Sequence, residues 1–316
     1  MSGRATSRAG AAAIAGLALV AACVTVAPPH RAPESGPPMS PIQDRYAGAR
    51  IDLLAAINRD RHAAGVAAVR LDSLASVAAQ GHASAMAAGG FFSHYGQLGE
   101  APYERLARAG LTGHVQENVS RWQVRGLVPI GTADPWPAFD VNEAHGSLMA
   151  SPGHRETILD PHRTHVGLGI ASDPAGGAVY VVEDFLSRYV EIDPPRLAWP
   201  GSKTPLAGRV LDPSLRPLLL LLRREPDDTS RRGETPPPGP YSDGHGEGAI
   251  VPPWAIGWRP AGRSFELDLG PLLREPGRWY GIVYVAPRKV VEGALAAGAV
   301  NTSQGWPGAA FVVDVY

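Results

Sequence analysis

Cysteine is nearly absent from this sequence, since Cys23 is the only one among 316 residues. A single cysteine excludes an intramolecular disulfide framework and a zinc site built from several thiolates. Long apolar runs are also missing, because no stretch reaches the ~18 residues that a membrane-spanning helix needs. The formal net charge is only −1, and there is no long basic run. These absences argue against a spanning helix and against a nucleic-acid-binding protein.

Several catalytic signatures are missing as well. The chain has no G-x-S-x-G nucleophile elbow, no Walker loop and no H-E-x-x-H zinc motif. The glycine-rich string GHGEG at residues 244–248 neither follows a predicted strand nor opens a helix. We therefore expect a flexible loop there and not a nucleotide site.

What the chain does contain is glycine, proline and enough apolar residues for real cores. Its 37 glycines and 31 prolines show no collagen-like period, and hydrophobic residues make up 44% of the chain. At roughly 150 residues per domain, the length corresponds to two domains. We therefore expect a globular protein without a repeat architecture.

Residues 1–22 predict an export signal. Arg4 and Arg8 supply a positive start, and residues 11–22 are uncharged, apolar and too short to span a bilayer. The run ends in the string LVAAC at residues 19–23, which resembles the lipobox of bacterial lipoproteins. The resemblance implies cleavage before Cys23 and lipidation of that cysteine. The alternative is a plain secretory signal with an incidental cysteine.

Residues 23–42 form the predicted lipidated cysteine and flexible tether. This stretch is rich in proline and small polar residues, so it cannot bury a core. Several acyl chains on one cysteine would anchor the protein stably to a membrane. We therefore expect a protein of the bacterial cell envelope. Val24 stands where an aspartate is associated with inner-membrane retention, so the resemblance favours the outer membrane.

Two predicted domains follow, and the expected fold class is α+β. Residues 43–190 mix helical and strand patterns, including a hairpin over residues 166–185. Residues 191–316 contain short apolar runs between turn signals, which predict a smaller, all-β, sandwich-like domain. Within it, residues 290–299 are compatible with a short helix. Residues 224–253 are predicted as a flexible loop.

Four side chains at the ends of predicted elements form the candidate ligand cleft, namely His94, Glu117, Glu143 and His154. His94 lies in the loop after the second predicted helix, and Glu117 lies at the start of a predicted strand. Glu143 lies on a helix, and His154 lies in the first turn of the next helix. A helix N-terminus disfavours imidazolium, so we expect His154 to be neutral and able to bind a metal ion.

The strings around these residues are similar to the bacterial branch of a known family. In chain order they are INRDR (57–61), FFSH (91–94), ENV (117–119), SPGHRETIL (151–159), VGLG (166–169) and EDF (183–185). Together they resemble the CAP superfamily over residues 48–187. This superfamily contains cysteine-rich secretory proteins, antigen 5 and pathogenesis-related 1, and its domain is also called SCP-like. The resemblance implies a three-layer α-β-α sandwich with a central cleft.

In that family two histidines and two glutamates converge in the cleft and can hold a divalent cation. Carried over by position, the resemblance assigns His94, Glu117, Glu143 and His154 to the cleft, and the first, second and last of them to the metal. Gln116 stands where the family has glycine. Leu148 stands where it has tryptophan, which loosens the alignment of the helix that carries Glu143.

Three classes of function remain open at this point. Two imidazoles with carboxylates suit zinc, whose bound water is a strong nucleophile at neutral pH. The chain is therefore either a binding protein for a small apolar ligand or envelope component, or a metal-dependent hydrolase of peptides or cell wall. In a structural envelope protein, the same side chains would form a satisfied polar network. We expect the first, with zinc as the cation if one binds, and we assign no catalytic residue.

We do not assign the other histidines or the tryptophans of the second domain to a functional site. We expect five histidines to be structural or solvated, namely His82, His114, His145, His162 and His165. Four tryptophans of the second domain are expected to pack in the sandwich and not to form a sugar-stacking platform. They are Trp254, Trp258, Trp279 and Trp306.

Overall fold

The structure is a computed structural model that describes residues 46–123, 139–173, 177–225 and 248–316. The predicted signal, Cys23 and the tether lie outside these ranges, as does most of the GHGEG string. In the ranges described, no helix has the length and apolar composition to cross a bilayer.

A four-stranded sheet with the order β1-β3-β4-β2 organises the first part of the described chain. Its strands are β1 (Arg70–Leu71), β2 (His114–Gln123), β3 (His165–Ser172) and β4 (Ala178–Ser187). Both β2 and β3 pair antiparallel with β4. The predicted hairpin is therefore confirmed, and β2 forms one edge of the sheet.

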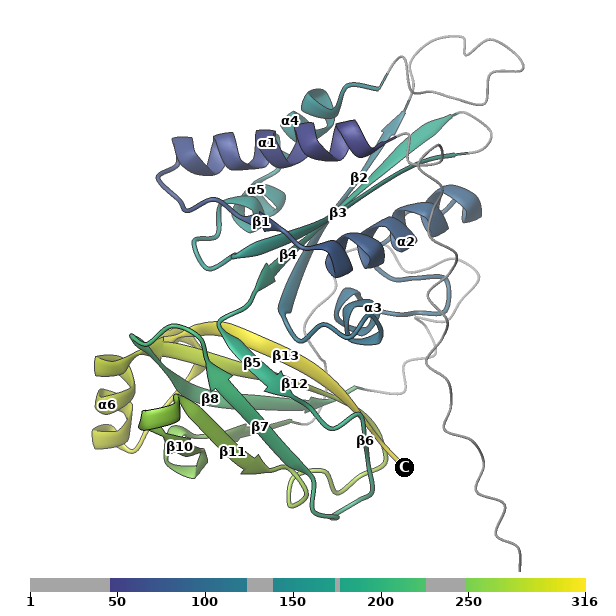
Figure 1. Cartoon of the computed structure of the whole chain (residues 1–316). Helices are drawn as coiled ribbons and strands as arrows, with labels where there is room; N and C mark the ends of the chain where they lie inside the picture. Colours follow the sequence, from purple (N-terminus) through teal and green to yellow (C-terminus); the bar gives the residue numbers. More distant parts are fainter. Residues whose placement is uncertain (1–45, 124–138, 174–176, 226–247) are drawn as a thin grey trace, which may run out of the picture. The chain divides into compact units, whose positions relative to one another are not determined.

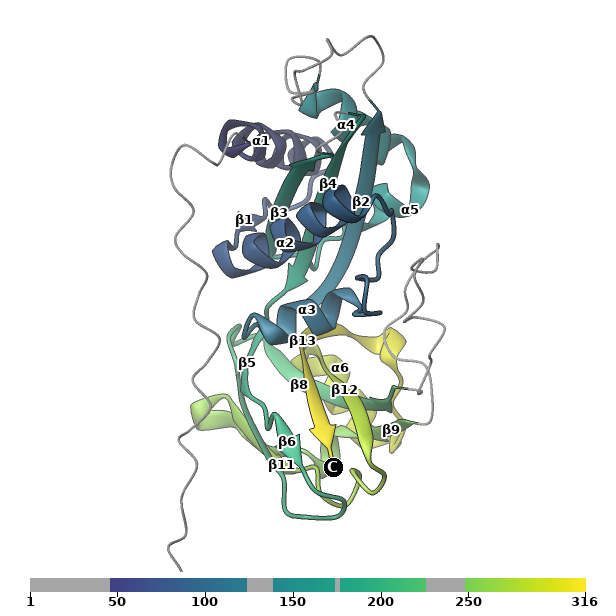
Figure 2. The ribbon, with the colours of Figure 1, turned by 90° about the vertical axis from the view of Figure 1, so that its right-hand side faces the viewer.

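Helices cover both faces of this sheet (Figure 1). One face carries α1 (Ala47–Ala63), α4 (Val141–Ala150) and α5 (Pro152–Leu159). The other face carries α2 (Ser73–Gly89) and α3 (Pro102–Arg108), and it is turned toward the viewer in Figure 2. This arrangement is the three-layer α-β-α sandwich that the sequence predicts.

The sequence explains how closely α2 packs on the sheet. Asp72 caps the helix by accepting a hydrogen bond from the backbone N–H of Ala75 at 2.9 Å. The helix then crosses β3 at Gly167 and Gly169, where an added Cβ would come within 2.3 Å of helix backbone. The VGLG string therefore serves the packing of α2 against β3.

Two further sheets follow and form a sandwich. One has the order β10-β11-β7-β5 and contains β5 (Val190–Asp193), β7 (Pro205–Val210), β10 (Gly257–Arg259) and β11 (Ser264–Asp268). The other has the order β6-β13-β12-β8-β9 and contains β6 (Leu197–Ala198), β8 (Leu215–Arg224), β9 (Gly248–Val251), β12 (Gly277–Pro287) and β13 (Trp306–Val315). Side chains of both sheets share one core, so the predicted all-β region is confirmed.

Short helices connect some of the strands of this sandwich. They are η3 (Pro253–Ala255), η4 (Pro260–Gly262), α6 (Arg288–Ala297) and η5 (Thr302–Gln304). The α6 helix corresponds to the short helix predicted over residues 290–299. The flexible loop predicted over residues 224–253 is wrong at its end, because β9 begins at Gly248 and pairs antiparallel with β8. Four residues are too few to show a strand pattern beside a proline-rich stretch, so only the pairing reveals it.

The leucine run of β8 is buried on both faces of its sheet. Leu220 and Leu222 belong to the sandwich core, whereas Leu219 and Leu221 belong to a second core that also contains Leu106 of α3. A strand covered on both sides needs no polar alternation. This explains why the run carries five consecutive leucines, at residues 218–222.

Polar and aromatic contacts accompany this second core. Tyr103 of α3 stacks on Tyr280 of β12, with ring centroids 4.1 Å apart, and donates a hydrogen bond to Glu225 at 2.5 Å. Arg278 forms an ion pair with Glu104 at 2.7 Å. Residues on both sides of position 190 thus share a core, and Arg45–Tyr316 form one compact unit. The division into two domains at residue 190 stays a prediction.

Candidate functional site

The candidate site lies at the edge strand β2. After α2 ends, Gly90 takes a left-handed conformation (φ 63°) and begins the loop that carries His94. This loop places His94 Nδ1 2.9 Å from Oε1 of Glu117, which lies on β2. The Glu117 side chain is fully buried, whereas 16% of the His94 side chain is exposed. His94 is therefore the member of this pair that meets solvent.

Arg105 fixes the His94–Glu117 pair from α3. Its guanidinium forms an ion pair with Oε2 of Glu117 and donates hydrogen bonds to the backbone carbonyls of His94 at 2.8 Å and Glu100 at 3.0 Å. One cation thus holds both the buried carboxylate and the loop that carries the imidazole. Sequence reasoning missed Arg105, because no motif distinguishes it from the other arginines of its helix.

Of the two neighbouring carboxyl groups of Glu117 and Asp184, only one is negatively charged. Burial favours the neutral form of Glu117, but Arg105 and His94 outweigh burial and lower its pKa. Asp184 pairs with Glu117 across β2 and β4, so both carboxyl groups point to the same face of the sheet. Burial and the charge of Glu117 raise the pKa of Asp184 well above its ordinary value. We assign the negative charge to Glu117 and the proton to Asp184.

His154 approaches β2 from the opposite face. Asn118 follows Glu117 on the strand, so its side chain points the other way, and its amide donates a hydrogen bond to the His154 carbonyl at 3.2 Å. Burial and the nearby His94 lower the pKa of His154, in the direction expected for a neutral ring. Among the described residues, Nδ1 of His154 is buried without a hydrogen-bond partner.

A second buried cluster lies on the same face as His154. Glu183 of β4 is opposite Asn118 and accepts a hydrogen bond from its amide at 3.2 Å. His145 of α4 places Nδ1 3.7 Å from Oε1 of Glu183 and Nε2 2.9 Å from Oδ2 of Asp60. Burial lowers the pKa of His145, but these two carboxylates outweigh it and raise the pKa. Asp60 belongs to the INRDR string and Glu183 to the EDF string. Neither string alone shows that both carboxylates contact His145.

Glu143 has no contact with the other predicted cleft residues among the interactions of the described residues, so its place in the cleft stays a prediction. Its side chain is exposed on α4, whereas His145, two residues later, is only 2% exposed. Residues two apart on a helix point to different sides. The packing that buries His145 therefore leaves Glu143 in solvent.

The zinc site that the resemblance implies does not fit the side chains as they lie. Within the ranges that the structure describes, no three His, Cys, Asp or Glu side chains are arranged to hold a metal ion. Glu117 explains this, because Arg105 and His94 already engage both of its oxygens. A metal bound by His94, Glu117 and His154 would compete with Arg105 for the charge of Glu117. Zinc binding by the chain stays a prediction.

A polar cavity of about 630 Å³ lies between β2 and α5, and Gly153, which precedes His154, is one of its lining residues. It is lined by β2, by α5 and by the turn that follows α5. The lining residues are Gln116, Gly153, Glu156, Thr157, Leu159, Asp160 and Pro161. The volume is within the range of small-molecule sites. Gln116 stands where the resemblance expects glycine, so it adds a side chain to a cavity wall.

Comparisons with known proteins identify a family for part of the chain. Residues 54–185 match the model of the cysteine-rich secretory protein family, CAP. These residues form a CAP domain. The matched span contains His94, Glu117 and His154 together with Arg105 and the second cluster. No curated protein matches the chain.

Three solved structures are similar to parts of the chain. An extracellular protein with an SCP domain from Bacillus anthracis is 18% identical, with 48% of this chain and 45% of that chain covered and a TM-score of 0.38. An outer surface protein from Borrelia burgdorferi is 14% identical, with coverages of 45% and 95% and a TM-score of 0.37. A cysteine-rich secretory protein from Staphylococcus aureus is 20% identical, with coverages of 46% and 40% and a TM-score of 0.34. The chain spans less than half of the first and third proteins.

Some of the other predicted histidines and tryptophans have packing roles, whereas the packing expected for Trp254 is wrong, because Trp254 is 52% exposed. His82 Nε2 lies 2.8 Å from the Ser93 carbonyl, and burial lowers the pKa of His82 to about 4. The ring of His162 stacks on Trp306 with centroids 4.1 Å apart, and Trp279 is buried in the sandwich core. The packing roles expected for His82, Trp279 and Trp306 are therefore confirmed.

Proposed function

We propose that the chain is an exported bacterial envelope lipoprotein whose CAP domain binds a polar envelope component beside His154. The observation that carries this proposal is the buried Nδ1 of His154, which has no hydrogen-bond partner in the described ranges. A buried ring nitrogen without a partner is unfavourable. The adjacent polar cavity, lined by the preceding Gly153, gives a ligand access to this neighbourhood.

The cavity lining favours a polar ligand over a small apolar one. Gln116 and Thr157 offer amide and hydroxyl groups, and Glu156 and Asp160 offer carboxylates. Burying these groups against a hydrocarbon would leave their hydrogen bonds unmade. Sugars and peptides of the cell wall carry the hydroxyl, amide and ammonium groups that match this lining.

The position of Arg105 favours binding over metal-dependent hydrolysis. A metal-dependent hydrolase built on His94, Glu117 and His154 needs a Glu117 oxygen for the metal or for a proton. The buried Glu117 instead pairs with Arg105 and orients His94. This arrangement holds the loop of His94 in place at the edge of β2.

The ligand proposal is tested with residues 24–316, which include the compact unit Arg45–Tyr316. Soluble disaccharide-peptide fragments of peptidoglycan are titrated calorimetrically, and phosphatidylcholine vesicles, whose headgroups carry no net charge, serve as the lipid comparison. We expect the fragments to bind and His154→Ala to weaken binding about tenfold or more, the effect of one lost buried hydrogen bond. His62→Ala is the matched control, because His62 is exposed on α1. Equal binding by both variants, or binding to vesicles alone, would contradict the proposal.

The anchor is tested separately in a Gram-negative host that expresses the full chain. Cells are fed alkyne-palmitate, and the wild type is compared with Cys23→Ser. We expect label and membrane association in the wild type and no label in the variant. A wild-type chain that is unlabelled and released from the cell would identify a plain secretory signal instead.

A further inference from the structure

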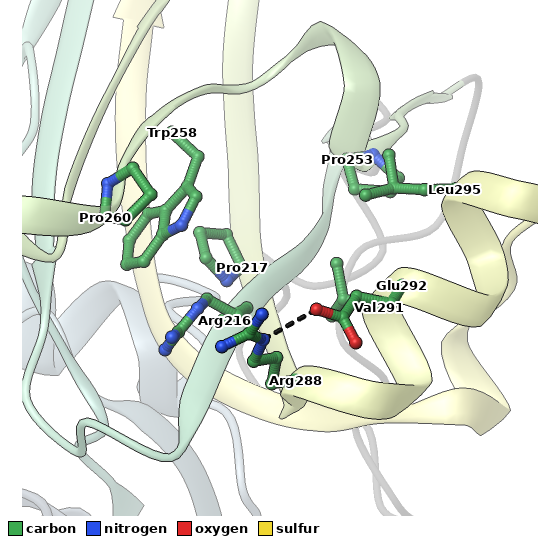
Figure 3. A pocket seen from close by; sticks show the side chains of 9 residues that line it. All are labelled: Arg216, Pro217, Pro253, Trp258, Pro260, Arg288, Val291, Glu292 and Leu295. Atoms are coloured by element: carbon green, nitrogen blue, oxygen red, sulfur yellow. Dashed lines mark hydrogen bonds and ion pairs between the residues drawn. The ribbon is translucent and has the colours of Figure 1, made fainter.

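A pocket of about 300 Å³ lies in the sandwich, outside residues 54–185 that form the CAP domain (Figure 3). Three separate pieces of chain line it: the start of β8, one side of α6, and the segment from η3 through β10 to η4. None of its residues belongs to the site beside His154. The two sites therefore share no side chain.

The walls of this pocket are mainly apolar. Pro217, Pro253 and Val291 are buried, and the indole of Trp258 is half-buried beside them. Leu295 is 47% exposed at the rim, which leaves an apolar side chain for a ligand to cover. Proline and aliphatic side chains offer no hydrogen bonds, so the body of a ligand in this pocket must be apolar as well.

Arg216 supplies a fixed cation in the same pocket. Its Nη1 donates hydrogen bonds to the carbonyls of Pro213 at 2.8 Å and Leu215 at 2.6 Å, and its guanidinium carbon lies 5.4 Å from the centre of the Trp258 ring. Among the described residues, none accepts a hydrogen bond from its Nε or Nη2. These two groups form one edge of the guanidinium, which matches the two oxygens of a carboxylate.

The remaining charges at the pocket nearly balance each other. Arg288 donates a hydrogen bond to Glu292 one turn later on α6, at 2.6 Å (Figure 3). This pair leaves the positive charge of Arg216 as the net charge of the lining. A ligand with one negative charge completes the balance, whereas a dianion also meets the carboxylate of Glu292.

We infer that this pocket binds a small monocarboxylate with a compact apolar body, held by Arg216 at the carboxylate and by Trp258 and the proline walls at the body. A cavity of ~150 Å³ accommodates benzene. A volume of about 300 Å³ therefore suits one ring with a short acid side chain. This inference does not rest on the proposed function of the CAP domain.

The test uses 3-phenylpropionate as the probe and residues 24–316 as the protein. Binding is followed by nitrogen–proton NMR of the tryptophan indole groups, and Trp258→Leu identifies the Trp258 signal by its loss. We expect 3-phenylpropionate to shift that signal in a saturable way. 3-Phenylpropanol, which has the same body without the charge, and inorganic phosphate, which has the charge without the body, should each bind at least about tenfold more weakly.

Variants separate the role of Arg216 from loss of folding. Arg216→Met keeps the length of the side chain and should weaken 3-phenylpropionate binding about tenfold or more. Arg259→Met is the matched control, because Arg259 is exposed next to Trp258 and pairs with Glu266 outside the pocket. Leu295→Asp changes only the exposed rim and should also weaken the acid by repulsion, with an unchanged melting temperature.

Three results would overturn this inference. They are no saturable shift with 3-phenylpropionate, equal binding of the acid and the alcohol, and equal effects of Arg216→Met and Arg259→Met. His154→Ala, which tests the CAP site, should leave 3-phenylpropionate binding unchanged. The failure of one proposal is therefore distinguishable from the failure of the other.

Discussion

Each face of the CAP sheet buries a glutamate carboxylate, but the side chain that neutralises its charge differs between the two faces. On the face covered by α2 and α3, the carboxylate of Glu117 meets Arg105, a permanent cation. On the face covered by α1, α4 and α5, the carboxylate of Glu183 meets His145, whose charge depends on pH. The two acids are cross-strand neighbours of Asp184 and Asn118, respectively. One strand pair thus supports a fixed charge network and a titratable one.

This difference reverses the behaviour of two equally buried histidines. His82 and His145 are each 2% exposed. Burial, together with the charge of Arg105, lowers the pKa of His82 to about 4. Burial also opposes the charge on His145, but Glu183 and Asp60 outweigh it and raise the pKa. Burial thus lowers the pKa of both rings, and only at His145 do neighbouring carboxylates reverse its effect.

The largest expected effect comes from removing the permanent cation. Arg105→Met leaves the fully buried Glu117 without its counter-charge, and breaking a buried pair in this way costs about 3–5 kcal/mol. We expect a loss of that size in the free energy of unfolding, measured with urea at pH 7. Arg108→Met on the same helix removes only the partly exposed pair with Glu100 and should cost less than about 1 kcal/mol. Equal losses in both variants would show that Arg105 is not the counter-charge that stabilises Glu117.

The next effect concerns His82 and appears on acidification. The folded pKa of about 4 lies below the ordinary value of 6.5, so the folded state disfavours the proton. The stability of the wild type relative to His82→Gln is therefore fully present above pH 6.5 and is lost as the pH falls toward 4. Two and a half pKa units correspond to about 3 kcal/mol. Urea unfolding of both proteins at pH 7, 5.5 and 4 measures this loss, and a constant difference between them would contradict it.

His145 should show the opposite dependence. Its folded pKa lies above the ordinary value of 6.5. Its charged form therefore adds stability that is fully present below pH 6.5 and is lost as the pH rises through the folded pKa. The difference in unfolding free energy between the wild type and His145→Gln should shrink from pH 6 to pH 9. A difference that grows over this interval would show that Glu183 and Asp60 do not govern the ring.

The smallest expected effect is that of Glu143→Gln. Glu143 is exposed on α4 and belongs to neither network. We expect the free energy of unfolding to change by less than about 0.5 kcal/mol, and binding of peptidoglycan fragments to stay the same. A loss of binding in the calorimetric titration would show that Glu143 contributes to the ligand cleft.

Local patterns predict much of this fold. Asp72 before an apolar helical stretch marks the start of α2, and Ser151-Pro152 marks the start of α5. The strings around His94, Glu117 and His154 identify the CAP domain. These features depend on residues that are close in the sequence, so one sequence is enough to find them.

The rest depends on contacts between distant parts of the chain. Arg105 reaches Glu117 from another element, and His145 meets Asp60 and Glu183 from two others. Glu143 lies two residues from His145, and only the packing of α4 decides which of them is buried. The pocket around Arg216 likewise combines three separate pieces of chain, which no local pattern brings together.

The most direct test of the difference between the two faces is a titration of the histidine rings. Nitrogen NMR of residues 24–316, labelled at histidine, follows the protonation of each imidazole between pH 4 and 9, with His82→Gln and His145→Gln to assign the signals. The difference between the two faces predicts that His145 titrates above pH 6.5 and that His82 stays neutral down to about pH 4. Two buried rings that titrate in the same direction from pH 6.5 would contradict it.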